Sequence, residues 1–243
     1  MGKIYVIGIG PGDLEHMTIK AREALEESDL IVGYSTYVEL IKEYFPQKEF
    51  ISSQMTREVE RCIMVLQKAE EGRIVALISS GDSGIYGMAG IMLEVASKEG
   101  SSIPVEVVPG VTAASAAAAV LGAPVMHDFA VISLSDLLTP WETIEKRLEY
   151  AAMGDFVVCL YNPKSRNRQD YIRIARDLLL QHRQGGTPVG IVRNAGRKQE
   201  SMDIATLETM LDFEIDMFTM VIIGNSMTYI EGKRIITPRG YKL

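Results

Sequence analysis

A turn at residues 80–84, with the sequence Ser-Gly-Asp-Ser-Gly, combines residue types that can bind a flat, polar ligand. The carboxylate of Asp82 can accept hydrogen bonds from a ribose diol. Gly81 and Gly84 allow the backbone to approach a ligand closely or to adopt positive φ. The same residues also suit a tight turn in which Asp82 only caps the next helix. From this motif alone, the two interpretations are equally good.

A second stretch, residues 109–122, begins with a Pro-Gly turn and continues as a helix made almost entirely of small residues. Such a helix can lie very close to a sheet or to a bound ligand, because no long side chains hold them apart. Thr112 offers a hydroxyl near the start of this helix, where backbone N–H groups lack partners. A closely packed core helix without a binding role is an equally good interpretation, and the two are compatible.

The loop at residues 8–13, Gly-Ile-Gly-Pro-Gly-Asp, follows a predicted strand at residues 3–7. It fails the dinucleotide-binding pattern Gly-x-Gly-x-x-Gly, because Asp13 stands in place of the third glycine. Pro11 also removes a backbone N–H that would hold a pyrophosphate. The loop therefore favours an uncharged or cationic ligand. The alternative is a rigid Pro-Gly turn with no ligand.

Candidates for proton transfer and for anion binding lie in the second half of the chain. An imidazole oriented by a carboxylate can transfer protons, and His127 precedes Asp128 directly. Neighbouring residues of a strand point to opposite faces, however, so a structural histidine is the more common role. A predicted strand at residues 155–161 is followed by three cations, which suit a carboxylate-binding site or a solvated helix face: Lys164, Arg166 and Arg168.

Buried strands and helices in alternation must position these groups. The central turn follows an apolar run at residues 75–78 and precedes a helical pattern at residues 88–98. Strands of a parallel sheet pass into helices in this way, and ligands bind beyond the carboxyl ends of such strands. We therefore predict an α/β protein with two domains, residues 1–122 and 123–243, and a terminal hairpin around residues 228–237.

Composition narrows the class of protein. The 243 residues are 47% hydrophobic and 23% charged, as in ordinary soluble proteins. The net charge of −7 disfavours nonspecific binding to nucleic acid. No apolar run reaches the roughly 20 residues of a membrane helix, and the chain starts as a strand rather than a signal peptide, so we expect a cytoplasmic protein. Cys62 and Cys159 form no Cys-x-x-Cys pair, and we expect two buried thiols and no metal site.

Together these stretches resemble the tetrapyrrole methyltransferases of the cobalamin and sirohaem pathways. The likeness spans nearly the whole chain and rests on the loop at residues 8–13, the turn at 80–82, residues 108–114 and residues 192–195. Ser83 stands where the family commonly has proline. With residues 84–89, 126–129, 132–141 and 161–163, that difference resembles the branch that methylates C17 of precorrin-3B or cobalt-factor III during ring contraction.

The resemblance implies S-adenosylmethionine as methyl donor, with S-adenosylhomocysteine as product. It implies two α/β domains, each a mainly parallel sheet flanked by helices, with the donor held between them, and a homodimer. Ring contraction needs proton transfers, for which the candidates are His127, Asp128 and Asp136. Carried over by position, the donor contacts are Pro11, Ser80, Gly81, Asp82, Ile85, Thr112, Ala113, Tyr161 and Ala195.

Three other functions are compatible with parts of this pattern. Methyltransferases of the same fold act on a modified histidine of a translation factor, as diphthine synthase does, or on ribosomal RNA, but a macromolecular substrate favours a more basic surface. A noncatalytic sensor of a nucleoside-like metabolite would bind the donor without turnover. A nicotinamide-dependent dehydrogenase is disfavoured by Pro11 and Asp13.

Overall fold

The computed structural model describes residues 2–54, 57–165 and 169–242, and the chain divides into two compact units, residues 1–113 and 114–243. The expected boundary lay after Gly122, whereas helix α5 (Ala113–Leu121) falls almost wholly in the second unit. Two contacts of α5 with the second unit explain this assignment. The backbone N–H of Ala114 donates to the Tyr161 hydroxyl at 3.1 Å. The Leu121 side chain packs so closely against Gly190 that a side chain on that glycine would overlap it.

The first unit contains a five-stranded sheet in the order β3-β2-β4-β1-β5. All neighbouring strands run parallel, which confirms the expected parallel sheet. Their carboxyl ends therefore meet at one edge, where ligands of α/β proteins bind. The strands are β1 (Lys3–Gly8), β2 (Leu30–Tyr34), β3 (Glu49–Ser53), β4 (Ile74–Ser79) and β5 (Val105–Val108).

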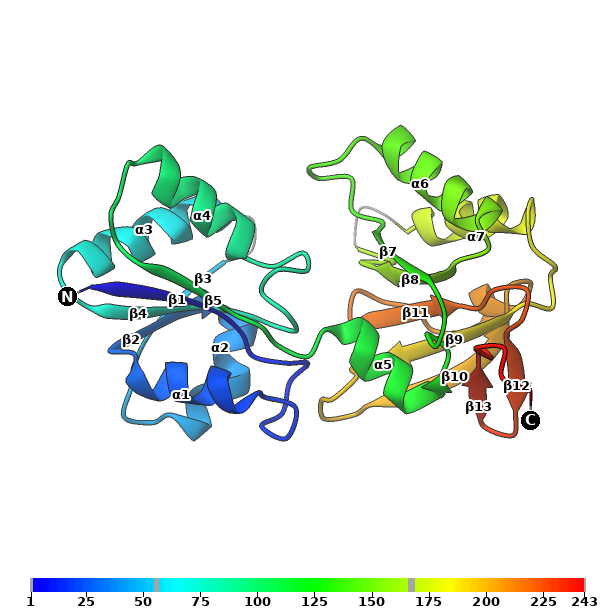
Figure 1. Cartoon of the computed structure of the whole chain (residues 1–243), viewed down its shortest axis with the longest axis horizontal. Helices are drawn as coiled ribbons and strands as arrows, with labels where there is room; N and C mark the ends of the chain where they lie inside the picture. Colours follow the sequence, from blue (N-terminus) through cyan, green and yellow to red (C-terminus); the bar gives the residue numbers. More distant parts are fainter. Residues whose placement is uncertain (1, 55–56, 166–168, 243) are drawn as a thin grey trace. The chain divides into compact units, whose positions relative to one another are not determined.

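Helices cover both faces of this sheet (Figure 1). One face packs against α1 and α2, and the other against α3 and α4, which gives the unit two separate apolar cores. The predicted N-cap of the first helix is confirmed, because the Thr18 hydroxyl accepts a hydrogen bond from the Ala21 N–H at 3.1 Å. The helices are α1 (Ile19–Glu27), α2 (Ser35–Ile41), the 3₁₀ helix η1 (Lys42–Tyr44), α3 (Glu58–Glu70) and α4 (Ala89–Lys98).

The second unit contains a mixed sheet in the order β10-β9-β11-β8-β7. The α/β class is confirmed, but the expected mainly parallel arrangement is wrong here, because only β7 and β8 pair in parallel. Strands β9 and β11 are buried on both faces and read as continuous apolar runs, so their sequences do not show their direction. The strands are β7 (Phe129–Ser133), β8 (Val157–Tyr161), β9 (Pro188–Arg193), β10 (Ser201–Thr206) and β11 (Thr219–Ile223).

Within this sheet β7, β8 and β9 run in the same direction, so their carboxyl ends share one edge. Helices α6 and α7 cover one face, and α5 lies on the other (Figure 1). The predicted terminal hairpin is confirmed, and its second strand also pairs with β6. The remaining elements are β6 (Gly122–Ala123), α6 (Trp141–Met153), α7 (Tyr171–Leu180), η2 (Met210–Asp212), β12 (Tyr229–Glu231) and β13 (Arg234–Ile236). Over the described residues, no helix has the length and apolar character needed to span a bilayer.

Candidate active site

Three glycine-containing loops meet at the carboxyl edge of the first sheet. Gly10 and Gly81 exchange backbone hydrogen bonds of 3.1 and 2.7 Å, and both have positive φ, which glycine adopts without strain. A Cβ placed on Gly110 would lie 2.2 Å from the Gly81 carbonyl oxygen, and one on Gly8 would lie 2.7 Å from the same atom. The loops after β1, β4 and β5 therefore pack backbone against backbone, and only glycine fits at these positions.

The carboxylate of Asp82 joins two of these loops. Its Oδ1 accepts a hydrogen bond from the Gly84 N–H at 2.8 Å, as in an Asx turn, and its Oδ2 accepts one from the Gly110 N–H at 2.9 Å. Each carboxylate oxygen has about two acceptor sites, so a ribose diol can still be bound by the remaining lone pairs. The turn role is thus confirmed, but Asp82 does not cap the next helix, because α4 begins after Met88 and has no side-chain cap. The binding role of Asp82 stays a prediction.

The other predicted donor contacts of the first unit lie around this turn. A Cβ on Gly81 would come within 3.6 Å of the Ala113 nitrogen and 3.7 Å of the Thr112 Cα, so the turn after β4 lies directly against that segment. Pro11 is buried beside Gly10, Ser80 is half-buried, and Ile85 is exposed. The structure therefore brings the predicted contacts of the first unit together. This edge carries backbone groups and one carboxylate, which are groups that can hydrogen-bond a nucleoside.

Ser83, which replaces the proline common in the family, has a structural role in this turn. Its side chain is fully buried, and its hydroxyl donates to the Val108 carbonyl oxygen at 3.2 Å. Val108 is the last residue of β5. The serine thus supplies one more link between the turn after β4 and the end of β5, which a proline could not make.

At the carboxyl edge of the second sheet, two asparagines follow strands of the same direction, which are separated in the sheet by the antiparallel β11. Asn162 follows β8 and Asn194 follows β9, and both adopt left-handed backbone conformations with φ of 52° and 53°. The Asn162 amide donates to the Ser133 hydroxyl at 2.9 Å, and the Asn194 N–H donates to the Phe218 carbonyl oxygen at 3.1 Å. These bonds fix the backbone around two predicted donor contacts, half-buried Tyr161 and buried Ala195.

Asp136 lies at this same edge in a cluster that sequence reasoning did not find. The Tyr171 hydroxyl donates to Asp136 Oδ2 at 2.6 Å, and the Tyr171 ring stacks on Trp141 with centroids 3.9 Å apart. The carboxylate is therefore held by a neighbour 35 residues away in sequence. No short-range pattern predicts such a contact. An oriented carboxylate next to a phenol can accept and return a proton.

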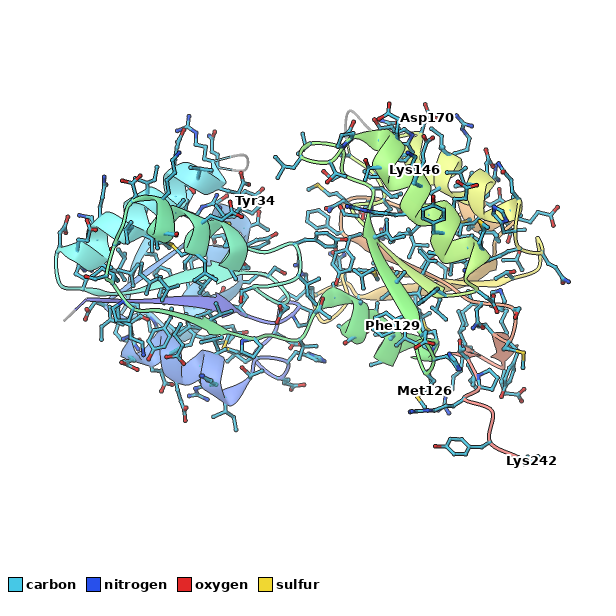
Figure 2. The ribbon with its side chains drawn as sticks, turned by 45° about the horizontal axis from the view of Figure 1, so that its top comes forward. Tyr34, Met126, Phe129, Lys146, Asp170 and Lys242 are labelled. Carbon is cyan, nitrogen blue, oxygen red and sulfur yellow. The ribbon has the colours of Figure 1, made fainter. Side chains whose placement is uncertain are left out.

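His127 and Asp128 lie at the opposite edge. They precede β7, whereas Asp136 follows it, and Figure 2 accordingly shows Met126 far from Asp170, the residue before α7. The His127 Nδ1 is 3.5 Å from Asp128 Oδ2, and both side chains are exposed. They line a pocket of about 380 Å³ together with Asp155, Asn225, Arg239 and neighbouring residues. The structure thus separates these two candidates from the third.

The predicted cations are only partly described. Arg166 and Arg168 lie outside the described residues, and Lys164 is half-buried just beyond the end of β8.

Arg61 in the first unit is a cation that sequence reasoning missed, and it is only 4% exposed. It donates to the Ser53 hydroxyl at 2.7 Å and the Gln54 carbonyl oxygen at 2.9 Å, and no carboxylate of the described residues lies within 4.0 Å of it. The sequence carried one signal for the burial of Arg61, because this residue lies four positions before Val65 on the buried face of α3.

The two cysteines are buried thiols, as predicted. Burial raises the pKa of both Cys62 and Cys159 to about 12, so neither is a thiolate near neutral pH. Among the residues that the structure describes, His, Cys, Asp and Glu side chains form no group of three or more that could hold a metal ion.

Comparisons with known proteins find similar sequences and a similar fold. A family model described as tetrapyrrole (corrin/porphyrin) methylases matches residues 3–211. A protein of Salmonella typhimurium named probable cobalt-factor III C(17)-methyltransferase is 52% identical over 99% of this chain and 100% of its own length. A cobalt-factor III methyltransferase of Priestia megaterium is 51% identical over 99% of this chain, which spans 45% of that longer protein. Among solved structures, the methyltransferase CobJ is 35% identical and superposes with a TM-score of 0.91 over 98% of this chain and 100% of its own.

Proposed function

The chain belongs to the tetrapyrrole methylases, and on that premise we propose that it methylates C17 of cobalt-factor III or precorrin-3B in cobalamin biosynthesis. The observation that carries this proposal is the 52% identity to a probable cobalt-factor III C(17)-methyltransferase over the full length of that relative. The TM-score of 0.91 to the methyltransferase CobJ supports the same reaction class. Ring contraction accompanies methylation in the reaction that we propose.

S-adenosylmethionine is the proposed methyl donor, and when bound it supplies an electrophilic methyl group on a sulfonium. In the first unit, Asp82 would hold the ribose hydroxyls, while backbone groups of Gly81 and the segment from Thr112 to Ala113 would bind the remaining nucleoside. Methyl transfer to carbon is an in-line displacement, so positioning and exclusion of water supply most of the catalysis. The further proposed contacts are Pro11, Ser80 and Ile85 in the first unit and Tyr161 and Ala195 in the second.

Asp136 is the proposed proton-transfer residue for ring contraction. Its carboxylate lies at the carboxyl edge of β7 and is oriented by the Tyr171 hydroxyl at 2.6 Å. His127 and Asp128 lie at the other end of β7, so we assign them no step.

The proposed substrate is a large ring edged by carboxylates. Lys164 would supply a cation for these carboxylates, and Arg166 and Arg168 are further candidates from the sequence. We also propose that the protein acts as a homodimer, which its sedimentation coefficient would test.

Methyl transfer to defined acceptors tests the proposed function. The protein is incubated with labelled S-adenosylmethionine and, separately, with cobalt-factor III, precorrin-3B, a translation factor that carries the modified histidine, and ribosomal RNA. Our proposal predicts one methyl group on one of the two tetrapyrroles and one equivalent of S-adenosylhomocysteine, measured by mass spectrometry. Label on either macromolecule would contradict it. Binding of the donor without turnover on any acceptor would instead indicate a sensor.

A further inference from the structure

The loop between β7 and α6, residues 134–140, exposes two consecutive leucines at the carboxyl edge of the second sheet. Leu137 is 68% exposed and Leu138 is 94% exposed, although leucine is among the residue types most often buried. The loop extends beyond the end of β7 (Figure 1). Its apolar tip therefore lies at the edge that also carries Asp136 and Tyr161.

Firm contacts hold the loop on both sides of this tip. On the side of β7, Leu134 is fully buried, and its N–H donates to the Tyr161 carbonyl oxygen at 2.9 Å. Asp136 accepts the hydrogen bond from Tyr171. On the side of α6, the Trp141 ring stacks on the same Tyr171 ring at 3.9 Å. The leucines are thus presented by an anchored loop, and their exposure does not follow from a loose backbone.

We propose that Leu137 and Leu138 form an apolar cover that contacts one face of the tetrapyrrole ring. This inference rests on the proposed function, because it takes its ligand from it. A tetrapyrrole has two broad apolar faces and a rim of carboxylates. An anchored loop with two exposed leucines suits a face, whereas half-buried Lys164, just beyond the neighbouring strand β8, suits the rim. Continuity with the candidate site distinguishes this patch from the apolar residues scattered over the rest of the surface.

Contacts between these leucines and the ring should affect substrate binding more than the chemical step. Apolar contact with a ring face is the same in the bound substrate and in the transition state, so its loss raises KM and leaves kcat nearly unchanged. Affinity for S-adenosylmethionine does not change, because the leucines contact the ring only. The double variant Leu137→Ser with Leu138→Ser should weaken tetrapyrrole binding by roughly tenfold or more, as expected for the apolar area involved.

Trp141 provides a direct binding signal, because it is the one tryptophan of the chain. Cobalt-factor III is titrated into the wild type and the double variant without methyl donor, and quenching of Trp141 fluorescence gives each dissociation constant. Met227→Ser is the matched control. Met227 is 61% exposed on a loop of the same unit and lines the pocket at the opposite edge of the sheet. The melting temperature of each variant verifies that it is folded.

The expected result is weaker ring binding in the double variant, unchanged binding in Met227→Ser, and unchanged calorimetric affinity for S-adenosylmethionine in both. Wild-type affinity of a folded double variant for cobalt-factor III would overturn the apolar cover while leaving the proposed function intact. Failure of the wild type itself to methylate either cobalt-factor III or precorrin-3B would instead overturn the proposed function. A double variant that does not fold is replaced by the two single variants, for which a smaller loss of the same sign is expected.

Discussion

At the scale of single residues, Asp82 has a structural role, and we propose a binding role for the same carboxylate. Its two oxygens accept backbone hydrogen bonds from Gly84 and Gly110, so the carboxylate orients the turn and the next loop before any ligand binds. The sequence predicted a turn residue or a ribose ligand, and it could not reveal that one of the partners lies 28 residues away. Preorganised acceptors lower the entropy cost of binding, which makes the two roles mutually supportive.

We predict that Asp82→Ala lowers the free energy of unfolding by about 2 kcal/mol, because two backbone N–H groups lose a charged acceptor. The same change should reduce the calorimetric affinity for S-adenosylmethionine by at least about tenfold, the effect of one lost hydrogen bond to a charged group. Asp29→Ala is the matched control. Asp29 accepts the Ile74 N–H at 2.8 Å at the opposite end of β4, so its loss should affect stability alone. Near-normal affinity of folded Asp82→Ala would exclude Asp82 from the donor site.

At the scale of elements, the loops after β1, β4 and β5 pack closely against one another. Gly8, Gly81 and Gly110 bring three backbones into contact, and no side chain separates them. The glycine-rich turns and the parallel strands that carry them were predictable, because apolar runs alternate with helical patterns and glycine marks each turn. The contact between the three turns was not predictable, because it depends on the strand order β4-β1-β5.

We predict that Gly110→Ala destabilises the first unit by about 3 kcal/mol or more, because its Cβ would lie 2.2 Å from the Gly81 carbonyl oxygen and 2.5 Å from that of Gly8. Gly90→Ala serves as the control. Gly90 lies in α4, and apart from the backbone of that helix nothing lies within 4 Å of its Cβ position, so alanine should raise the free energy of unfolding there by about 0.5–1 kcal/mol. Denaturant titration measures both. Equal stability of the two variants would contradict the close packing of the three loops.

At the scale of the whole molecule, the two units differ in how far their folds could be predicted. Four strands of the parallel sheet in the first unit were predicted from the sequence, but β3 was missed, and so was β10 in the second unit. Both are edge strands with several polar residues, so neither gives a continuous apolar run. The directions of β9 and β11 were missed because strands buried on both faces show no alternation. The proposed donor contacts come from the resemblance and stay predictions, whereas the Tyr171 partner of Asp136 and the buried Arg61 became visible only in three dimensions.

The position of the transferred methyl group tests the central claim most directly. A single turnover with [methyl-¹³C]S-adenosylmethionine is run with cobalt-factor III and, separately, with precorrin-3B, and ¹³C NMR of each isolated ring follows. Our account predicts one labelled methyl group, on C17 of a contracted ring, from one of the two substrates. Label on any other ring carbon, or two unlabelled rings recovered from folded protein saturated with donor, would contradict it.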